Sequence, residues 1–132
     1  MILIDGEGIP LSVFTLGANV AEVHAIENLV DVRQVDKKPK RLVYDKAADA
    51  DWLRGAMEER EIELICPHRR GRKKPPRQDG RSLRRYARRY KVERTITWLQ
   101  NFRRLVCRYE RYPELFESFA VLACTIITLK RF

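Results

Sequence analysis

The stretch from residue 86 to residue 105 constrains the fold of this chain more than any other. Its apolar side chains recur three or four residues apart, which predicts one long amphipathic helix with a stripe at Val92, Ile96, Leu99 and Phe102. Tyr86, Arg89 and Glu93 lie on a different face and are expected to converge, because their spacing is also three and four residues. A lone acid in a basic helix is ordinarily a salt-bridge partner, and that interpretation stays open for Glu93.

The most basic part of the chain precedes this predicted helix and runs into its start. Between residues 68 and 91, twelve of 24 residues are Lys or Arg and one is acidic. Gly and Pro residues predict an exposed loop over residues 68–85. A basic run is commonly only a solvated segment. At this density, with Tyr86 and Tyr90 interleaved, it favours phosphate binding, and the net charge of +9 favours nucleic acid over a membrane without separating DNA from RNA.

The rest of the chain predicts a mixed α/β pattern in one domain of 132 residues. A hairpin is expected over residues 2–14, with Asp5 assigned to its Asp-Gly turn rather than to catalysis. Strands are predicted at 41–45 and 61–67, and helices follow the hairpin and the first of these strands. An apolar helix closes the chain and must pack against the sheet or another chain.

The cysteines and the apolar runs indicate the cellular compartment of the protein. Cys66, Cys107 and Cys124 are scattered and odd in number, which indicates reduced thiols and a cytoplasmic protein. Cys66-Pro-His68 lacks the further ligands of a zinc site. The longest apolar run, residues 119–129, is too short to span a membrane.

Asp45 follows the strand predicted at 41–45 and precedes a helix. An acid at the carboxyl end of a buried strand is where α/β folds place their chemistry, although Asp45 is equally well explained as a turn residue. Asp49 or Asp51 is expected to cap the helix that follows.

Two motifs together resemble a known family. Tyr86-x-x-Arg89-x-x-x-Glu93, with the Arg-Thr-Ile-Thr-Trp-Leu and Phe-Arg-Arg-Leu that follow it, resembles the C-terminal signature of bacterial insertion-sequence DDE transposases. Asp45-Lys-Ala-Ala-Asp49 resembles the Asp-Lys-Gly-Tyr-Asp motif of that family. Gln100 stands where the family often has Lys, and Ala47 and Ala48 replace Gly and Tyr. The resemblance covers almost the whole chain.

The resemblance implies an RNase H-like mixed sheet with flanking helices, here lacking the N-terminal, central strand that carries the first catalytic Asp. It implies that Asp45 and Glu93 are catalytic acids that bind Mg²⁺ or Mn²⁺, since hard cations take carboxylate oxygens. Tyr86 and Arg89 are then expected at the DNA backbone. The other expected DNA-binding residues are basic: Arg69, Arg70, Arg72, Lys73, Lys74, Arg84 and Arg85.

The function implied is DNA transposition by residues 1–132 as the C-terminal portion of a DDE transposase catalytic domain. The partners implied are double-stranded DNA at the element ends, an upstream transposase fragment and further copies of the chain, with no membrane. Alone, the chain is expected to be inactive because the first acid is absent, and only marginally folded because the sheet lacks its central strand. The alternative is a non-catalytic basic module that binds DNA or RNA.

Overall fold

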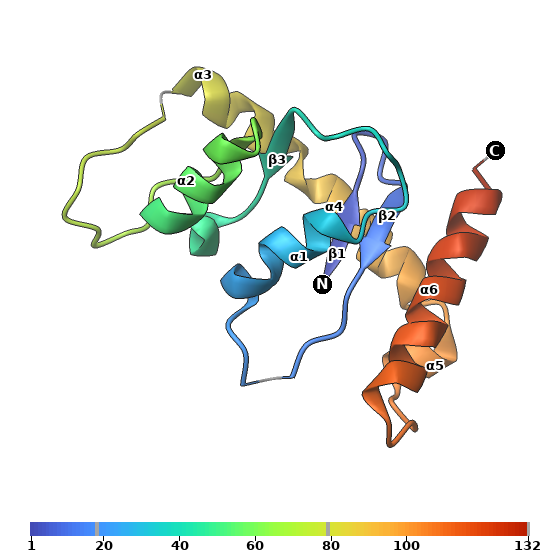
Figure 1. Cartoon of the computed structure of the whole chain (residues 1–132). Coiled ribbons are helices and arrows are strands. Elements are labelled where there is room, and N and C mark those ends of the chain that lie inside the picture. Colours follow the sequence, from blue (N-terminus) through green and yellow to red (C-terminus); the bar gives the residue numbers. More distant parts are fainter. Residues whose placement is uncertain (18, 79, 132) are drawn as a thin grey trace. The chain divides into compact units, whose positions relative to one another are not determined.

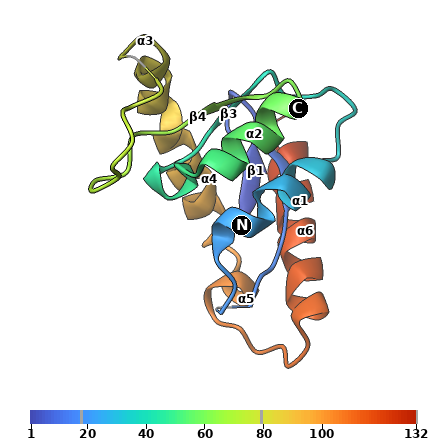
Figure 2. The same ribbon diagram turned by 60° about the vertical axis from the view of Figure 1, so that its left-hand side comes forward.

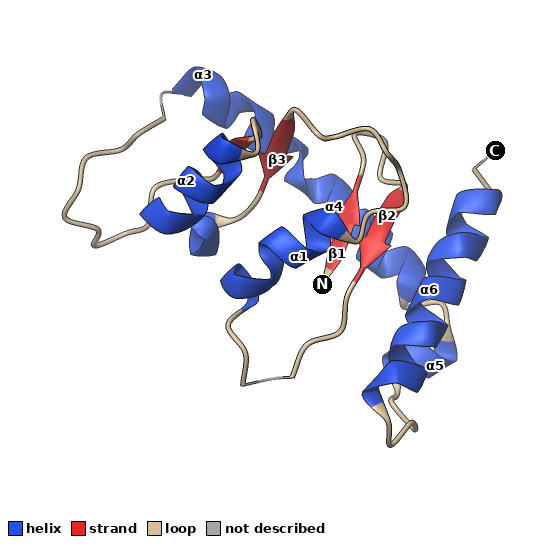
Figure 3. Ribbon diagram, viewed as in Figure 1, coloured by secondary structure: helices blue, strands red, loops and turns tan. Residues whose placement is uncertain are grey.

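The computed structural model describes residues 1–17, 19–78 and 80–131, and the chain divides into two compact units (Figure 1). The terminal unit comprises Met1–Asp36 and Tyr90–Phe132, and the central unit comprises Lys37–Arg89. Helices predominate and the strands are short (Figure 3). This content agrees with the predicted mixed α/β class.

The terminal unit is built on the predicted hairpin. Strands β1 (Ile2–Ile4) and β2 (Pro10–Val13) pair antiparallel with Leu3 opposite Ser12. The Ser12 hydroxyl donates to the carbonyl of Leu29 at 2.7 Å, which ties β2 to α1 (Ile26–Asp31). A short 3₁₀ helix, η1 (Glu22–Ala25), leads into α1. The buried residues of α1 are Ile26, Leu29 and Val30.

The prediction of a single helix over residues 86–105 is wrong. The chain forms η3 (Arg84–Arg89), α4 (Tyr90–Leu99) and α5 (Arg103–Val106) instead. At the end of α4, the backbone N–H groups of Asn101 and Phe102 donate to carbonyls three residues back, which tightens the last turn and ends the helix. Phe102 then takes an extended backbone before α5 begins.

The hairpin turn also decides which face of α4 is buried. Ile96 is 41% exposed, whereas the polar Thr95 beside it is fully buried. The Thr95 hydroxyl lies 2.7 Å from the carbonyl oxygen of Gly8, and Arg94 Nη2 donates to the carbonyl of Glu7 at 2.7 Å. Lys91 donates to the carbonyl of Gly6. We call these three side chains of α4 and the carbonyls of Gly6, Glu7 and Gly8 the turn clamp.

The turn itself confirms the structural role predicted for Asp5. Its Oδ1 accepts hydrogen bonds from the backbone N–H groups of Glu7 and Ile9, both at 2.8 Å. Gly8 has φ +89°, a conformation that L side chains rarely adopt. A Cβ there would lie 3.0 Å from Arg94 Nη2 and 3.2 Å from Thr95 Oγ1, so a side chain at this position would crowd the turn clamp as well as strain the backbone.

The closing helix α6 (Pro113–Leu129) contacts β2, α4 and α5. Ala120, Ala123, Cys124 and Ile127 are buried, while Leu115, Leu122 and Leu129 are exposed. The helix therefore buries one face within its own unit. No helix in the described part of the chain is long and apolar enough to cross a membrane.

The central unit is a βαβ arrangement. Strands β3 (Arg41–Val43) and β4 (Glu63–Ile65) pair in parallel, with Leu42 opposite Leu64. Between them run η2 (Lys46–Ala48) and the crossover helix α2 (Asp51–Glu59) (Figure 2). Leu53 and Met57 of α2 are fully buried. Helix α3 (Gly80–Leu83) precedes η3. Among the described residues the strands thus form two separate two-stranded sheets rather than the one mixed sheet that was predicted.

The turn clamp predicts which threonine of α4 stabilises the fold. We expect Thr95→Val to lower the free energy of unfolding by about 1–3 kcal/mol, because the buried carbonyl of Gly8 loses its donor while the side-chain volume is kept. Thr97→Val is the matched control: Thr97 is exposed and its hydroxyl donates only to a carbonyl of its own helix, Glu93, at 3.0 Å. Urea unfolding of both variants measures the difference. Equal effects at the two positions would show that the clamp contributes nothing.

Candidate functional site

The predicted acid Asp45 lies where β3 ends and η2 begins. Its Oδ1 accepts a hydrogen bond from the backbone N–H of Ala47 at 2.8 Å, so it caps η2. Its second carboxylate oxygen accepts no hydrogen bond from the described residues. Because β3 and β4 are parallel, Asp45 leaves from the same edge of the sheet as the segment beginning at Cys66. The turn role and the chemical role that the sequence left open for Asp45 are compatible.

Glu93 lies in the first turn of α4 and is exposed. It belongs to the terminal unit, whereas Asp45 belongs to the central unit. The described residues contain no group of three or more His, Cys, Asp or Glu side chains close enough to hold a metal ion. A carboxylate oxygen is a suitable ligand for Mg²⁺ or Mn²⁺, so the chemistry of Asp45 and of Glu93 fits such an ion.

Tyr86 and Arg89 share one side of η3. A 3₁₀ helix has three residues per turn, so side chains three apart lie one above the other. Both are half-buried, while Arg84 and Arg85 are exposed. The structure thus groups these four predicted DNA-binding residues on one short element, η3, which contacts α3 and β3.

A buried carboxylate that sequence reasoning assigned only to helix capping dominates the central unit. The side chain of Asp49 is 2% exposed and forms ion pairs with Arg54 Nη2 at 3.0 Å and Arg72 Nη1 at 2.5 Å. It also accepts the backbone N–H of Arg69 at 2.9 Å. The prediction that Asp49 or Asp51 caps α2 is wrong, because the N-cap is Ala50 and no side chain bonds there.

The surroundings of Asp49 keep it ionised. Burial alone would raise the pKa of its carboxyl. The hydrogen bond from the Arg69 amide and the guanidinium groups of Arg54 and Arg72 outweigh burial and hold the pKa below its ordinary value. The sequence signal for this role was available, since an Arg stands five residues after Asp49 and a dense basic run follows in the same βαβ unit.

Asp51 holds the next part of the basic segment. It pairs with Arg72 Nη2, with Lys74 Nζ at 2.7 Å and with Arg77 Nε at 3.7 Å. Hydrogen bonds from Lys74 and then from Arg72 lower the pKa of Asp51 to about 2. Arg72 therefore bridges the two carboxylates, with one nitrogen of its guanidinium fork on each.

The far end of the basic segment is attached to β4. Gln78 Nε2 donates to the carbonyl of Leu64 at 2.6 Å, and Gln78 Oε1 accepts the backbone N–H of Cys66 at 3.2 Å. The side-chain amide thus occupies backbone bonding positions at the edge of the parallel pair, as a neighbouring strand would. Burial raises the pKa of the Cys66 thiol to about 11, so it remains protonated at neutral pH. Cys66, Cys107 and Cys124 are all free thiols, as predicted, with Cys107 exposed.

These contacts divide the cations predicted to bind DNA. We call residues 69–78 the anchored loop. Arg69, Arg70 and Lys73 are exposed on it, whereas the side chain of Arg72 is 13% exposed and that of Lys74 is paired with Asp51. The hollow beneath the loop, about 520 Å³, is lined by the cations of the loop together with Asp49 and Asp51. Because Arg72 and Lys74 are paired with these carboxylates, the other cations of the loop are the ones left to contact a polyanion.

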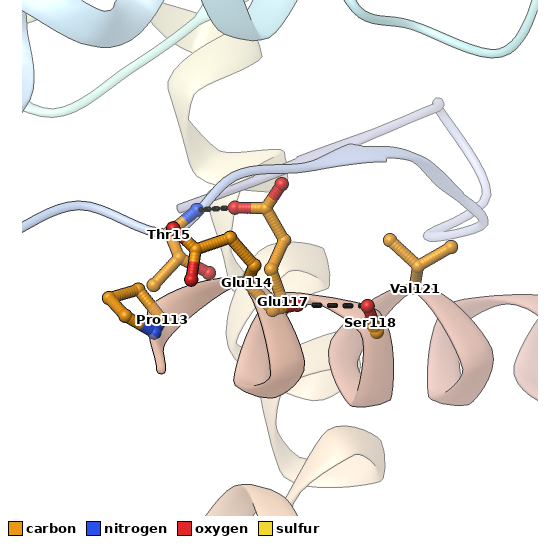
Figure 4. A pocket seen from close by; sticks show the side chains of 6 residues that line it. All are labelled: Thr15, Pro113, Glu114, Glu117, Ser118 and Val121. Atoms are coloured by element: carbon orange, nitrogen blue, oxygen red, sulfur yellow. Dashed lines mark hydrogen bonds between the residues drawn. The ribbon is translucent and has the colours of Figure 1, made fainter. Parts of the chain in front are cut away.

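A second hollow lies at the start of α6 (Figure 4). Glu117 accepts the backbone N–H of Thr15 at 2.9 Å, which attaches the segment after β2 to α6. Glu114 lies beside it, and the lining contains no basic side chain. Two carboxylates without a basic side chain make this hollow unsuited to a nucleic acid.

Comparisons with known proteins agree with the resemblance. A family model described as "Transposase DDE domain" matches residues 1–129. A curated protein of Burkholderia cepacia, named "Putative transposase for insertion sequence element IS402", is 36% identical over 141 residues. That match covers 98% of this chain and 63% of the relative, so the chain spans less than two thirds of the relative's length. No solved structure matches the chain.

The lowered pKa of Asp51 predicts how its contribution to stability depends on pH. The folded pKa of about 2 lies below the ordinary value of 3.8, so the ion pairs of Asp51 stabilise the fold fully above about pH 4. That contribution is lost as the pH falls through about 2. We expect Asp51→Asn to be less stable than the parent at neutral pH, with a difference that shrinks between about pH 4 and pH 2. Urea titrations across this range measure it, and a difference independent of pH would contradict the assignment.

Proposed function

This chain belongs to the transposase DDE domain family, and we propose that it takes part in DNA transposition as the C-terminal portion of an RNase H-like catalytic domain. The observation that carries the proposal is the edge of the parallel pair in the central unit. Asp45 leaves that edge after β3, and the anchored loop leaves it after β4. A carboxylate able to bind a metal ion and a set of exposed cations therefore share one end of a βαβ unit, which is where such folds bind ligands.

For the chemistry, Asp45 and Glu93 would be metal-binding acids, completed by an acid from an upstream transposase segment. The Mg²⁺ or Mn²⁺ ions so held would activate the attacking oxygen and stabilise the leaving oxygen at a phosphodiester. The cap formed by Asp45 supports this role, because one oxygen fixes the carboxylate while the other is available. The turn clamp supports the role of Glu93, because it fixes α4 by contacts at Lys91, Arg94 and Thr95 on either side of that residue.

For the substrate, the exposed cations would contact the backbone of double-stranded DNA at the ends of the element. Arg69, Arg70 and Lys73 on the anchored loop and Arg84 and Arg85 on η3 are exposed. Tyr86 and Arg89 would contact the strand near the cut, with the tyrosine ring available for stacking. Transposition also joins two element ends, which further copies of the chain would hold.

Salt dependence tests the DNA contact. Each neutralised phosphate releases counterions, so affinity for duplex DNA should fall steeply as salt rises. We expect the triple variant Arg69→Ala, Arg70→Ala, Lys73→Ala to bind more weakly and to flatten the logarithmic salt slope by about 1 per lost phosphate contact. None of these side chains pairs with Asp49 or Asp51.

The control for that experiment removes the same charge elsewhere. Lys37, Arg103 and Arg111 are exposed, and their triple Ala variant has the same net charge. Its slope should stay near that of the parent chain. Fluorescence anisotropy with a labelled duplex measures all three proteins. If the loop variant and the control change alike, the loop is not the DNA contact.

Cleavage tests the acids. In the chain combined with its upstream segment, we expect Glu93→Gln and Asp45→Asn each to reduce Mg²⁺-dependent strand cleavage by on the order of 10²-fold or more, with DNA binding retained. Glu59→Gln, at the far end of α2, is the control and should cleave as the parent does. Retained metal-dependent cleavage by either of the first two variants would remove that residue from the catalytic set.

A further inference from the structure

The anchored loop is held at both ends by side chains outside the set that would bind DNA. At its start, Asp49 accepts the Arg69 amide and pairs with Arg72, and Asp51 pairs with Arg72 and Lys74. At its end, Gln78 bonds to β4. All these contacts lie within the central unit, and those of Asp49 are made by a buried carboxylate, whereas the Asp51–Lys74 pair is exposed.

We propose that Asp51 and Arg72 are positioning residues for DNA binding: they hold the anchored loop so that Arg69, Arg70 and Lys73 face solvent together. Two cations of the predicted DNA-binding set, Arg72 and Lys74, thus act within the protein rather than on phosphate. The inference rests on the proposed function and refines it. Neighbouring basic residues thus have different roles. Those that already donate hydrogen bonds to a carboxylate hold the loop, and the others face solvent.

The physical reason is preorganisation. A free loop with this many like charges repels itself and samples many conformations, and DNA would have to select the few that match its phosphates. Apparent affinity falls in proportion to the fraction of molecules in the binding conformation. Carboxylates beneath the loop neutralise its inner cations and leave the outer ones in a fixed arrangement.

A purely electrostatic account predicts the opposite sign, which makes the inference testable. Removing an acid beside a DNA-binding loop should tighten binding if only net charge matters, because Asp51→Asn makes the loop more positive and releases Lys74, Arg77 and Nη2 of Arg72. If the acid positions the loop, the same change should weaken binding. Asp51 is chosen because its side chain is 33% exposed, whereas Asp49→Asn would leave the buried Arg54 without its partner.

The experiment measures the affinity of the whole chain for duplex DNA. We expect Asp51→Asn to bind about tenfold more weakly than the parent, as when the binding conformation falls to about a tenth of the population. Glu59→Gln, which raises the net charge equally at the other end of α2, should bind as the parent or slightly more tightly. Asp51→Glu retains a carboxylate and should recover most of the lost affinity.

Arg72→Lys separates positioning from charge. It keeps the charge of a phosphate contact, but one ammonium group cannot bridge two carboxylates as a guanidinium fork does. We expect weaker DNA binding and, without DNA, faster trypsin cleavage between residues 69 and 77 for both Arg72→Lys and Asp51→Asn, mapped by mass spectrometry. Circular dichroism unchanged from the parent confirms that each variant is folded.

The outcomes distinguish a failure of this inference from a failure of the proposed function on which it rests. If the parent chain shows no salt-dependent binding to duplex DNA, the proposed function fails. If the parent binds while Asp51→Asn binds as well or more tightly, the acids only mask cations and the positioning role is overturned. Unchanged trypsin cleavage in both variants would overturn it equally, because the loop would then be ordered without its bridge.

Discussion

The central unit depends on the burial of one carboxylate. Asp49 is nearly inaccessible to solvent, so its charge must be compensated by donors within the protein. Two guanidinium groups and a backbone amide supply them, and these come from α2 and from the segment after β4. Breaking a buried ion pair by removing one partner costs about 3–5 kcal/mol in general. The Asp49 carboxylate therefore holds helix α2 and the basic segment together, because moving either one away would leave a buried charge without its ion-pair partner.

In the terminal unit, the side chains that hold the elements together donate to neutral carbonyl oxygens instead of to a carboxylate. The carbonyl oxygens of a tight turn point at α4, where Lys91, Arg94 and Thr95 donate to them. In both units, cations that a charge count assigns to a nucleic acid are engaged by the protein itself. Arg94 also stacks on the ring of Trp98, 5.0 Å from its centroid, and Arg131 lies 4.1 Å from the same ring. The net positive charge of the chain therefore overestimates the number of cations that a polyanion can contact.

This division bears on how a transposase domain of this family would handle DNA. Phosphate contacts need cations that are exposed and fixed in position, and exposure alone does not fix a side chain. Arg70 and Lys73 are exposed, whereas Arg72 between them is turned inward onto Asp49 and Asp51. Neighbours in sequence therefore differ in their contacts: Arg72 is held by Asp49 and Asp51, while Arg70 and Lys73 are exposed.

The sequence by itself determined the α/β class, the hairpin turn at Asp5, the strand that precedes Asp45, and the family. Those features follow from local chemistry and periodicity: an Asp-Gly turn, alternating apolar residues and two linear motifs. It did not determine that the 86–105 stretch divides into η3, α4 and α5, or that Thr95 is buried and Ile96 exposed. The periodicity of this stretch carries no information about the carbonyl of Gly8, which is distant in sequence and accepts a hydrogen bond from Thr95. Only the structure showed that β3 and β4 pair in parallel. Only the tertiary structure decided which cations face inward, because that choice depends on carboxylates at positions 49 and 51 that meet Arg72 more than twenty residues later.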